Sequence, residues 1–214
     1  MSRIGIMGGT FNPIHVGHIK IADSAYKQYE LDEVWFMPNH IPAYKSNIDI
    51  VSGADRLNMV NIAISVYPYF KSSDYELKRE GKTYTYETIS LLKQDYPTDD
   101  FFFIMGADSL FYFDKWVKPD VIIANAEILV ASRNDKGLDA LNDKIKQLDD
   151  IFGGKHFHII TCDNVECSSS ILREYIRDTE PEEGLITEQN AYIKKYLDDD
   201  VYNYIINQNL YKNH

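Results

Sequence analysis

Cysteine is scarce in this sequence of 214 residues, since Cys162 and Cys167 are the only two and no C-x-x-C pair occurs. A disulfide framework or a zinc site is therefore not expected, and a reducing cytoplasm fits. No apolar run approaches the roughly 18 residues of a membrane span, and no basic-then-apolar signal region opens the sequence. Repeats and low-complexity segments are also missing, so we expect one domain over residues 1–214.

Positive charge is in short supply. The sequence has 22 Lys and Arg against 33 Asp and Glu, which gives a formal net charge of -11. A field of that sign repels nucleic acid and anionic membranes, so neither is expected as a partner. It also repels an anionic small molecule, which would need locally gathered positive groups and a divalent cation. The acidic excess itself is typical of a solvated surface.

Short apolar runs alternate with amphipathic segments along the whole sequence. This alternation predicts an α/β fold with a doubly wound, Rossmann-like parallel sheet and additional helices at the C-terminus. In such folds ligands lie beyond the carboxyl ends of the strands, at the switch point. The expected strands cover residues 4–7, 34–38, 69–77, 101–105, 128–131 and 157–160, and the expected helices cover 19–29, 52–67, 85–94, 119–124, 138–151, 168–176, 190–197 and 201–207.

Residues 8–18 form a glycine turn between the first strand and the first helix. Gly8 and Gly9 would let the backbone turn sharply and approach a ligand, and a helix start binds anions. His15 and His18, one turn apart, should project from the same side and could donate to phosphoryl oxygens. Paired glycines and a capping histidine are also common without any function. The run matches neither G-x-G-x-x-G nor the Walker pattern.

A second candidate anion site opens the helix expected at residue 168. Ser168, Ser169 and Ser170 can cap that helix and leave N–H groups for a ligand. Arg173 lies one turn further on, where its guanidinium could fork onto a phosphate. The plain alternative is an ordinary serine cap followed by a surface arginine.

These two segments carry a family resemblance. Residues 8–18 resemble the G-T-F-(D/N)-P-x-H-x-G-H motif of the H-x-G-H nucleotidyltransferases, and the closest resemblance is to bacterial nicotinate-nucleotide adenylyltransferases. Residues 167–173 resemble their I-S-S-T-x-I-R motif, with Cys167, Ser170 and Leu172 as conservative departures. Residues 84–88 match their Y-T-Y-x-T segment.

The resemblance implies transfer of the adenylyl group of ATP to nicotinate mononucleotide, a step of NAD biosynthesis, with Mg²⁺ bound to the ATP. It implies catalytic roles for His15, His18 and Arg173. It also implies that ATP contacts Gly8, Gly9, Thr10, Phe11, His15, His18, Lys45, Gly106, Asp108, Arg133, Ser168, Ser169, Ser170 and Arg173. Asp108 would accept hydrogen bonds from the ribose, although a helix N-cap is an equally good interpretation.

Thr85 and Trp116 are the residues that the resemblance assigns to the nicotinate nucleotide. Backbone donors at the Thr85 helix start would favour a carboxylate over an amide, and Trp116 would stack on the pyridine ring. A plain cap and a half-buried aromatic are the alternatives. The family pattern is incomplete around Lys45, where Ala43 and Tyr44 depart from it, and after Arg133, where Asn134 and Asp135 do.

Two other functions stay open from the sequence. A phosphopantetheine adenylyltransferase resembles this family but usually carries threonine at the position of His15 and lysine at that of Arg173. A nucleotide-binding sensor without catalysis would bind the same ligands and report to a partner. No protein metal ligands are expected, and the sequence leaves a homo-oligomer open.

Overall fold

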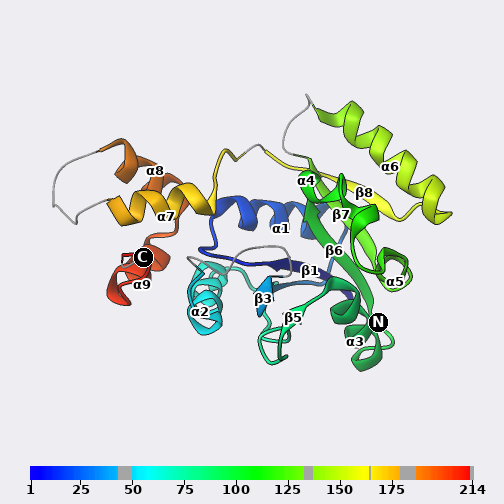
Figure 1. Ribbon diagram of the computed structural model, residues 1–214, viewed down its shortest axis with the longest axis horizontal. Helices are drawn as coiled ribbons and strands as arrows, with labels where there is room; N and C mark the ends of the chain where they lie inside the picture. Colours follow the sequence, from blue (N-terminus) through cyan, green and yellow to red (C-terminus); the bar gives the residue numbers. More distant parts are fainter. Residues whose placement is uncertain (43–49, 133–136, 164, 179–186, 213–214) are drawn as a thin grey trace.

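A computed structural model describes residues 1–42, 50–132, 137–163, 165–178 and 187–212. Its centre is a six-stranded parallel sheet in the order β4-β2-β1-β6-β7-β8 (Figure 1). This is the classic doubly wound order with β1 in the middle, so the predicted fold class is confirmed. The strands are β1 (Arg3–Gly9), β2 (Glu33–Pro38), β4 (Phe70–Ser72), β6 (Asp100–Gly106), β7 (Glu127–Ser132) and β8 (Phe157–Thr161).

Helices cover both faces of the sheet. Alternate residues of β6 enter different cores, since Phe102 and Ile104 belong to one hydrophobic cluster and Phe103 to the other. This two-sided burial explains why the strands read as continuous apolar runs. The first cluster includes residues of α1 (Val16–Gln28), α2 (Gly53–Ile64), α7 (Ser169–Asp178), α8 (Glu188–Tyr196) and α9 (Asp199–Asn207); the second includes residues of α3 (Thr85–Asp95), α4 (Ala107–Leu110), η1 (Phe113–Lys115), α5 (Pro119–Ile123) and α6 (Leu138–Phe152).

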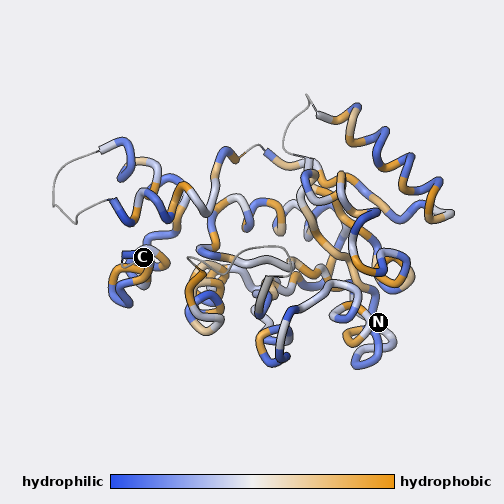
Figure 2. The backbone as a smooth tube through the Cα atoms, viewed as in Figure 1, coloured by the Kyte–Doolittle hydropathy of each residue, from blue (hydrophilic) through white to orange (hydrophobic). Residues whose placement is uncertain are grey.

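The amphipathic spacing that predicted the outer helices is visible along the chain. In Figure 2, α6 alternates between hydrophobic and hydrophilic segments along its length, and Leu141 and Leu148 are its buried residues. Helix α6 lies at one end of the molecule, whereas α7, α8 and α9 gather at the opposite end (Figure 1).

Several element boundaries differ from the sequence prediction. Helix α1 begins at Val16 rather than near residue 19, and β4 covers only Phe70–Ser72 of the strand expected over 69–77. A two-stranded parallel sheet of β3 (Ile41–Pro42) and β5 (Lys82–Thr83) lies in segments that we expected to be a loop and a turn. Strands of two residues have no periodicity to detect.

The switch point lies between β1 and β6, the central pair. Met7 is level with Ile104 in that pair, so the segments that follow Gly9 and Gly106 leave the sheet side by side. The described helices include none that is long and apolar enough to cross a membrane. The fold therefore brings the candidate segments to one edge of the sheet, as the sequence predicted.

Candidate active site

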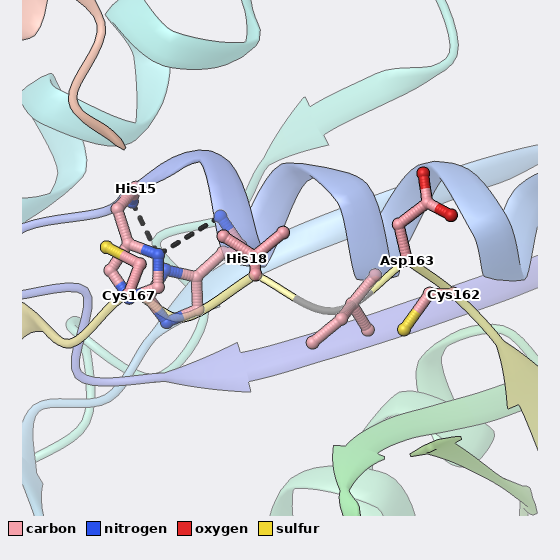
Figure 3. Close-up of a pocket in the computed structure, with 8 residues that line it drawn as sticks. His15, His18, Cys162, Asp163 and Cys167 are labelled. Atoms are coloured by element: carbon pink, nitrogen blue, oxygen red, sulfur yellow. Dashed lines mark hydrogen bonds between the residues drawn. The ribbon is translucent and has the colours of Figure 1, made fainter. Parts of the chain in front are cut away.

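His15 and His18 lie together at the start of α1. Their ring centroids are 3.8 Å apart, and both side chains line a cavity of about 60 Å³ between the first turns of α1 and the segment before α7 (Figure 3). The phenyl ring of Phe11 meets the His18 ring edge-on at 5.2 Å. The predicted juxtaposition of the two imidazoles is therefore present.

The spacing of the two histidines makes them cap their own helix. The Nδ1 atom of His15 accepts the Gly17 N–H at 3.1 Å, and Nδ1 of His18 accepts the His15 N–H at 3.2 Å. This is a reciprocal capping box, with imidazoles in place of the usual hydroxyl and carboxylate. Because each Nδ1 is an acceptor, a neutral ring must carry its proton on Nε2. The pair is thus set up as two Nε2–H donors.

The glycines of the motif serve close packing. A Cβ on Gly17 would lie 3.0 Å from Cε1 and Nδ1 of the His15 ring, and a Cβ on Gly9 would lie 3.0 Å from the Phe11 ring. We expected Gly8 and Gly9 to supply a sharp turn, but the left-handed residue of this loop is Phe11, with φ 49°. Phe11 is only 2% exposed, so its ring supports His18 from inside the core.

The serine segment reaches the same loop from the other side. The Ser168 hydroxyl accepts the Ser170 N–H at 3.2 Å, so this residue caps α7 as predicted. Ser169 Oγ donates to the Pro13 carbonyl at 3.0 Å, and Arg173 Nη1 donates to the Asn12 carbonyl at 2.8 Å. The buried Nε of Arg173 has no hydrogen-bond partner among the described residues. One guanidinium nitrogen of Arg173, Nη1, therefore holds the loop in place.

The first turns of the two helices that begin at this site, α1 and α7, contain no Asp or Glu. Among the described helices, α1 and α7 are the two without Asp or Glu in the first turn. The first turns of the others contain Asp55, Glu87, Asp108, Asp120, Asp139, Glu188, Asp199 and Asp200. In a chain of net charge -11, this leaves the first turns of two helices without a competing carboxylate, while the Asp163 side chain lines the cavity further along α1. The site is therefore suited to an anion.

Gly106 and Asp108 follow β6 at the neighbouring strand end. Gly106 is the N-cap of the short helix α4 and makes no side-chain cap, while Asp108 lies in its first turn. Asp108 is exposed and is not itself the N-cap. Its carboxylate is thus available to a ligand beside the β1 loop, as the proposed ribose contact requires.

The residues expected to bind the nicotinate nucleotide lie on the other side of β6. Trp116 is half-buried and meets the Phe103 ring edge-on at 6.1 Å, and the same Phe103 ring lies 3.4 Å from where a Cβ on Gly8 would be. Lys118 Nζ lies 4.7 Å from the ring centroid of Tyr86, the residue after Thr85. Trp116 and Tyr86 thus pack against the same hydrophobic cluster. The Thr85 hydroxyl is not the predicted cap, because Tyr84 is the N-cap.

Four residues named from the sequence remain to be placed. Cys162 and Cys167 are half-buried and line the cavity beside the histidines. Lys45 and Arg133 lie outside the described residues. The described residues contain no group of three or more His, Cys, Asp or Glu that could hold a metal ion.

Sequence reasoning missed one supporting side chain, the buried guanidinium of Arg56. It is 1% exposed and donates five hydrogen bonds, to the carbonyls of Thr10, Asn39, His40 and Val51 and to Asn39 Oδ1. Burial lowers its pKa. It ties the β1 loop to the segment after β2. The signal was present, since Arg56 shares the apolar face of α2 with Met59 and Val60.

Comparison with known proteins agrees with this geometry. The cytidylyltransferase-like family model matches residues 6–175. The class of protein is thus a nucleotidyltransferase with paired histidines at the switch point of a doubly wound sheet.

A curated Bacillus subtilis protein named nicotinate-nucleotide adenylyltransferase is 36% identical and covers 93% of this chain and 97% of its own length. A Lachnoclostridium phytofermentans protein, described as a probable nicotinate-nucleotide adenylyltransferase, is 38% identical over 99% of this chain and 100% of its own. The chain belongs to the nicotinate-nucleotide adenylyltransferase family.

Solved structures share the fold over the whole chain. A Plasmodium falciparum nicotinic acid mononucleotide adenylyltransferase complexed with NaAD has a TM-score of 0.78 and 22% identity, and it covers 100% of this chain and 99% of its own. The same enzyme complexed with APC has a TM-score of 0.77. The family assignment from sequence is confirmed, and these structures confirm the arrangement of the sheet and its helices.

Proposed function

We propose that this chain transfers the adenylyl group of ATP to nicotinate mononucleotide and releases pyrophosphate. The observation that carries the proposal is the pair of imidazoles at the α1 start, whose Nδ1 atoms accept backbone N–H groups and so leave Nε2 as the protonated nitrogen of a neutral ring. The α7 start, whose first turn holds no acidic residue, contacts the same loop. The 5′-phosphate of the acceptor attacks the α-phosphorus of ATP in line as the bond to pyrophosphate breaks. No covalent intermediate is needed, so alignment and charge stabilisation are the main tasks.

Each candidate side chain has a defined task in this proposal. His15 and His18 donate to the α-phosphoryl oxygens, while the α7 start, Arg173 and Lys45 hold the departing pyrophosphate. The Gly8–Thr10 backbone and Arg133 line the nucleotide site, and Asp108 binds the ribose. Backbone N–H groups at the Thr85 helix start bind the nicotinate carboxylate, and Trp116 stacks on its ring.

Magnesium enters the reaction as part of the substrate, the Mg²⁺–ATP complex. Mg²⁺ usually keeps several waters and binds through phosphates with few protein ligands. We further propose a cytoplasmic location and no nucleic-acid or membrane partner. The net charge of -11 supports the last two points.

Pyrophosphate release in the presence of Mg²⁺–ATP tests this function directly. We expect release with nicotinate mononucleotide, slower release with nicotinamide mononucleotide, and none with phosphopantetheine. Preferred use of phosphopantetheine would assign the chain to the related adenylyltransferases. ATP binding without release for any acceptor would instead indicate a sensor, and either result contradicts the proposal.

A further inference from the structure

The loop that leads into the paired histidines is held by side chains from distant elements. Its Thr10 carbonyl accepts from Arg56 Nη1 at 2.9 Å, its Asn12 carbonyl from Arg173 Nη1 at 2.8 Å, and its Pro13 carbonyl from Ser169 Oγ at 3.0 Å. The loop has no regular secondary structure of its own between Thr10 and His15. Its shape therefore depends on these outside donors.

One residue of the loop is also fixed by its side chain. Asn12 is 4% exposed, and its Oδ1 accepts the backbone N–H of Val51 at 3.2 Å and the hydroxyl of Tyr211 at 3.0 Å. Tyr211 lies 199 residues away in sequence. The end of the chain thus contacts a residue that lies three positions before His15.

Tyr211 reaches this position by a reversal of the chain after α9. Asn209 and Tyr211 both have left-handed backbones, with φ 51° and 67°. The ring then enters the core cluster that also contains Phe11 and Ile14, where it is 4% exposed. Its hydroxyl contacts Met59 Sδ at 4.0 Å. A buried hydroxyl needs a hydrogen-bond partner, and Asn12 Oδ1 provides it.

We propose that Tyr211 is a positioning residue for the nucleotidyl transfer: its buried hydroxyl fixes Asn12, and Asn12 fixes the turn that presents His15 and His18. This inference rests on the proposed function. A purely structural anchor would need only the ring, which phenylalanine supplies equally well. The hydroxyl adds a directed contact to the loop, so its removal should affect the imidazoles more than the fold.

The variant Tyr211→Phe removes that hydroxyl alone, and Tyr204→Phe is its matched control. Tyr204 precedes it in the same C-terminal part, and its hydroxyl donates to Asp55 Oδ1 at 2.9 Å and accepts from Asn58. We expect Tyr211→Phe to lower kcat about tenfold and Tyr204→Phe to change it less than about twofold. The KM for ATP should change little in both. Equal kcat in the two variants would overturn the proposal.

A double-mutant cycle tests whether Tyr211 acts through Asn12. Each protein carries Tyr211→Phe, Asn12→Ala or both, and kcat is normalised to the folded fraction measured by circular dichroism. If the hydroxyl acts through Asn12, Tyr211→Phe should cost little once Asn12→Ala is present. Fully additive losses would overturn this route.

The imidazole ¹⁵N signals give a readout that needs no turnover. Tyr211→Phe should shift the His15 and His18 ring signals, whereas Tyr204→Phe should leave them unchanged. Unshifted signals in Tyr211→Phe would overturn the proposal. Wild-type protein that fails to use nicotinate mononucleotide would instead overturn the proposed function, so the two failures are distinguishable.

Discussion

At the scale of single residues, the H-x-G-H motif is first a way to begin a helix. The Nδ1 atoms of His15 and His18 each accept a hydrogen bond from a backbone N–H, and Gly17 leaves room for the His15 ring. The same bonds determine which nitrogen carries the proton. The three-residue spacing is therefore required by the capping box as well as by the chemistry.

Cys167 lines the cavity beside the histidines and should react slowly. Burial raises the pKa of its thiol to about 11, against an ordinary value of about 8.5. Since the thiolate is the nucleophile, its alkylation by iodoacetamide should speed up about tenfold per pH unit between about pH 7.5 and 10. Peptide mass spectrometry at timed intervals measures this rate.

The unfolded protein in urea is the control for this measurement, because Cys167 should then titrate near its ordinary value. A rate for the folded protein that levels off below about pH 9 would show that the thiol is not protected by burial.

Residue identity allowed some site members to be predicted from the sequence. The histidines, the serines and Arg173 belong to ordered motifs, and the structure brings them to one loop. The Tyr211 contact with Asn12 could not be predicted, since a hydrogen bond between residues 199 positions apart leaves no local pattern. Arg56 could have been found, because a charge on the apolar face of an amphipathic helix predicts a buried partner.

At the scale of elements, α1 and α7 differ from the other described helices in their uncharged first turns. A carboxylate there would favour the helix dipole and stabilise the protein. In the proposed function, a phosphate of the substrate takes the place of that carboxylate. Stability and substrate binding should compete at these positions.

Ser170→Glu tests this competition at the second residue of α7. We expect the KM for ATP to rise about tenfold from charge repulsion, while the free energy of unfolding stays equal or increases by about 0.3–1 kcal/mol. Gln189→Glu places the same side chain at the second residue of α8 and should stabilise the protein without changing KM. Steady-state kinetics and urea denaturation measure the two effects. An unchanged KM in Ser170→Glu would contradict the assignment of an anion site to α7.

Element boundaries were harder to predict than element types. The Y-T-Y segment was expected to be capped by the Thr85 hydroxyl, yet α3 begins at Thr85 with Tyr84 as an N-cap that makes no side-chain bond. The β3–β5 pair was missed because its strands are two residues long. Both errors arise where tertiary contacts, rather than local propensity, determine the backbone.

At the scale of the whole molecule, the sequence predicted the fold class correctly because both faces of the sheet are buried. Continuous apolar strands alternating with amphipathic helices admit few topologies, and the observed strand order follows. That order brings the segments after β1 and β6 to one edge. In a chain of net charge -11, the proposed anion sites are the α1 and α7 starts, whose first turns hold no acidic residue.

In the proposed function, the distal nitrogens of the paired imidazoles stabilise the transition state, and two substitutions of His18 test this role. His18→Asn keeps an acceptor for the His15 N–H but removes the donor at the Nε2 position, whereas His18→Gln can restore a donor there. The measurement is kcat for pyrophosphate release with nicotinate mononucleotide, together with the ATP affinity and melting temperature of each variant. We expect His18→Asn to lose about 10²–10³ in kcat, with near-normal ATP affinity and melting temperature, and His18→Gln to recover part of that loss. Near-normal turnover in His18→Asn would contradict the claim.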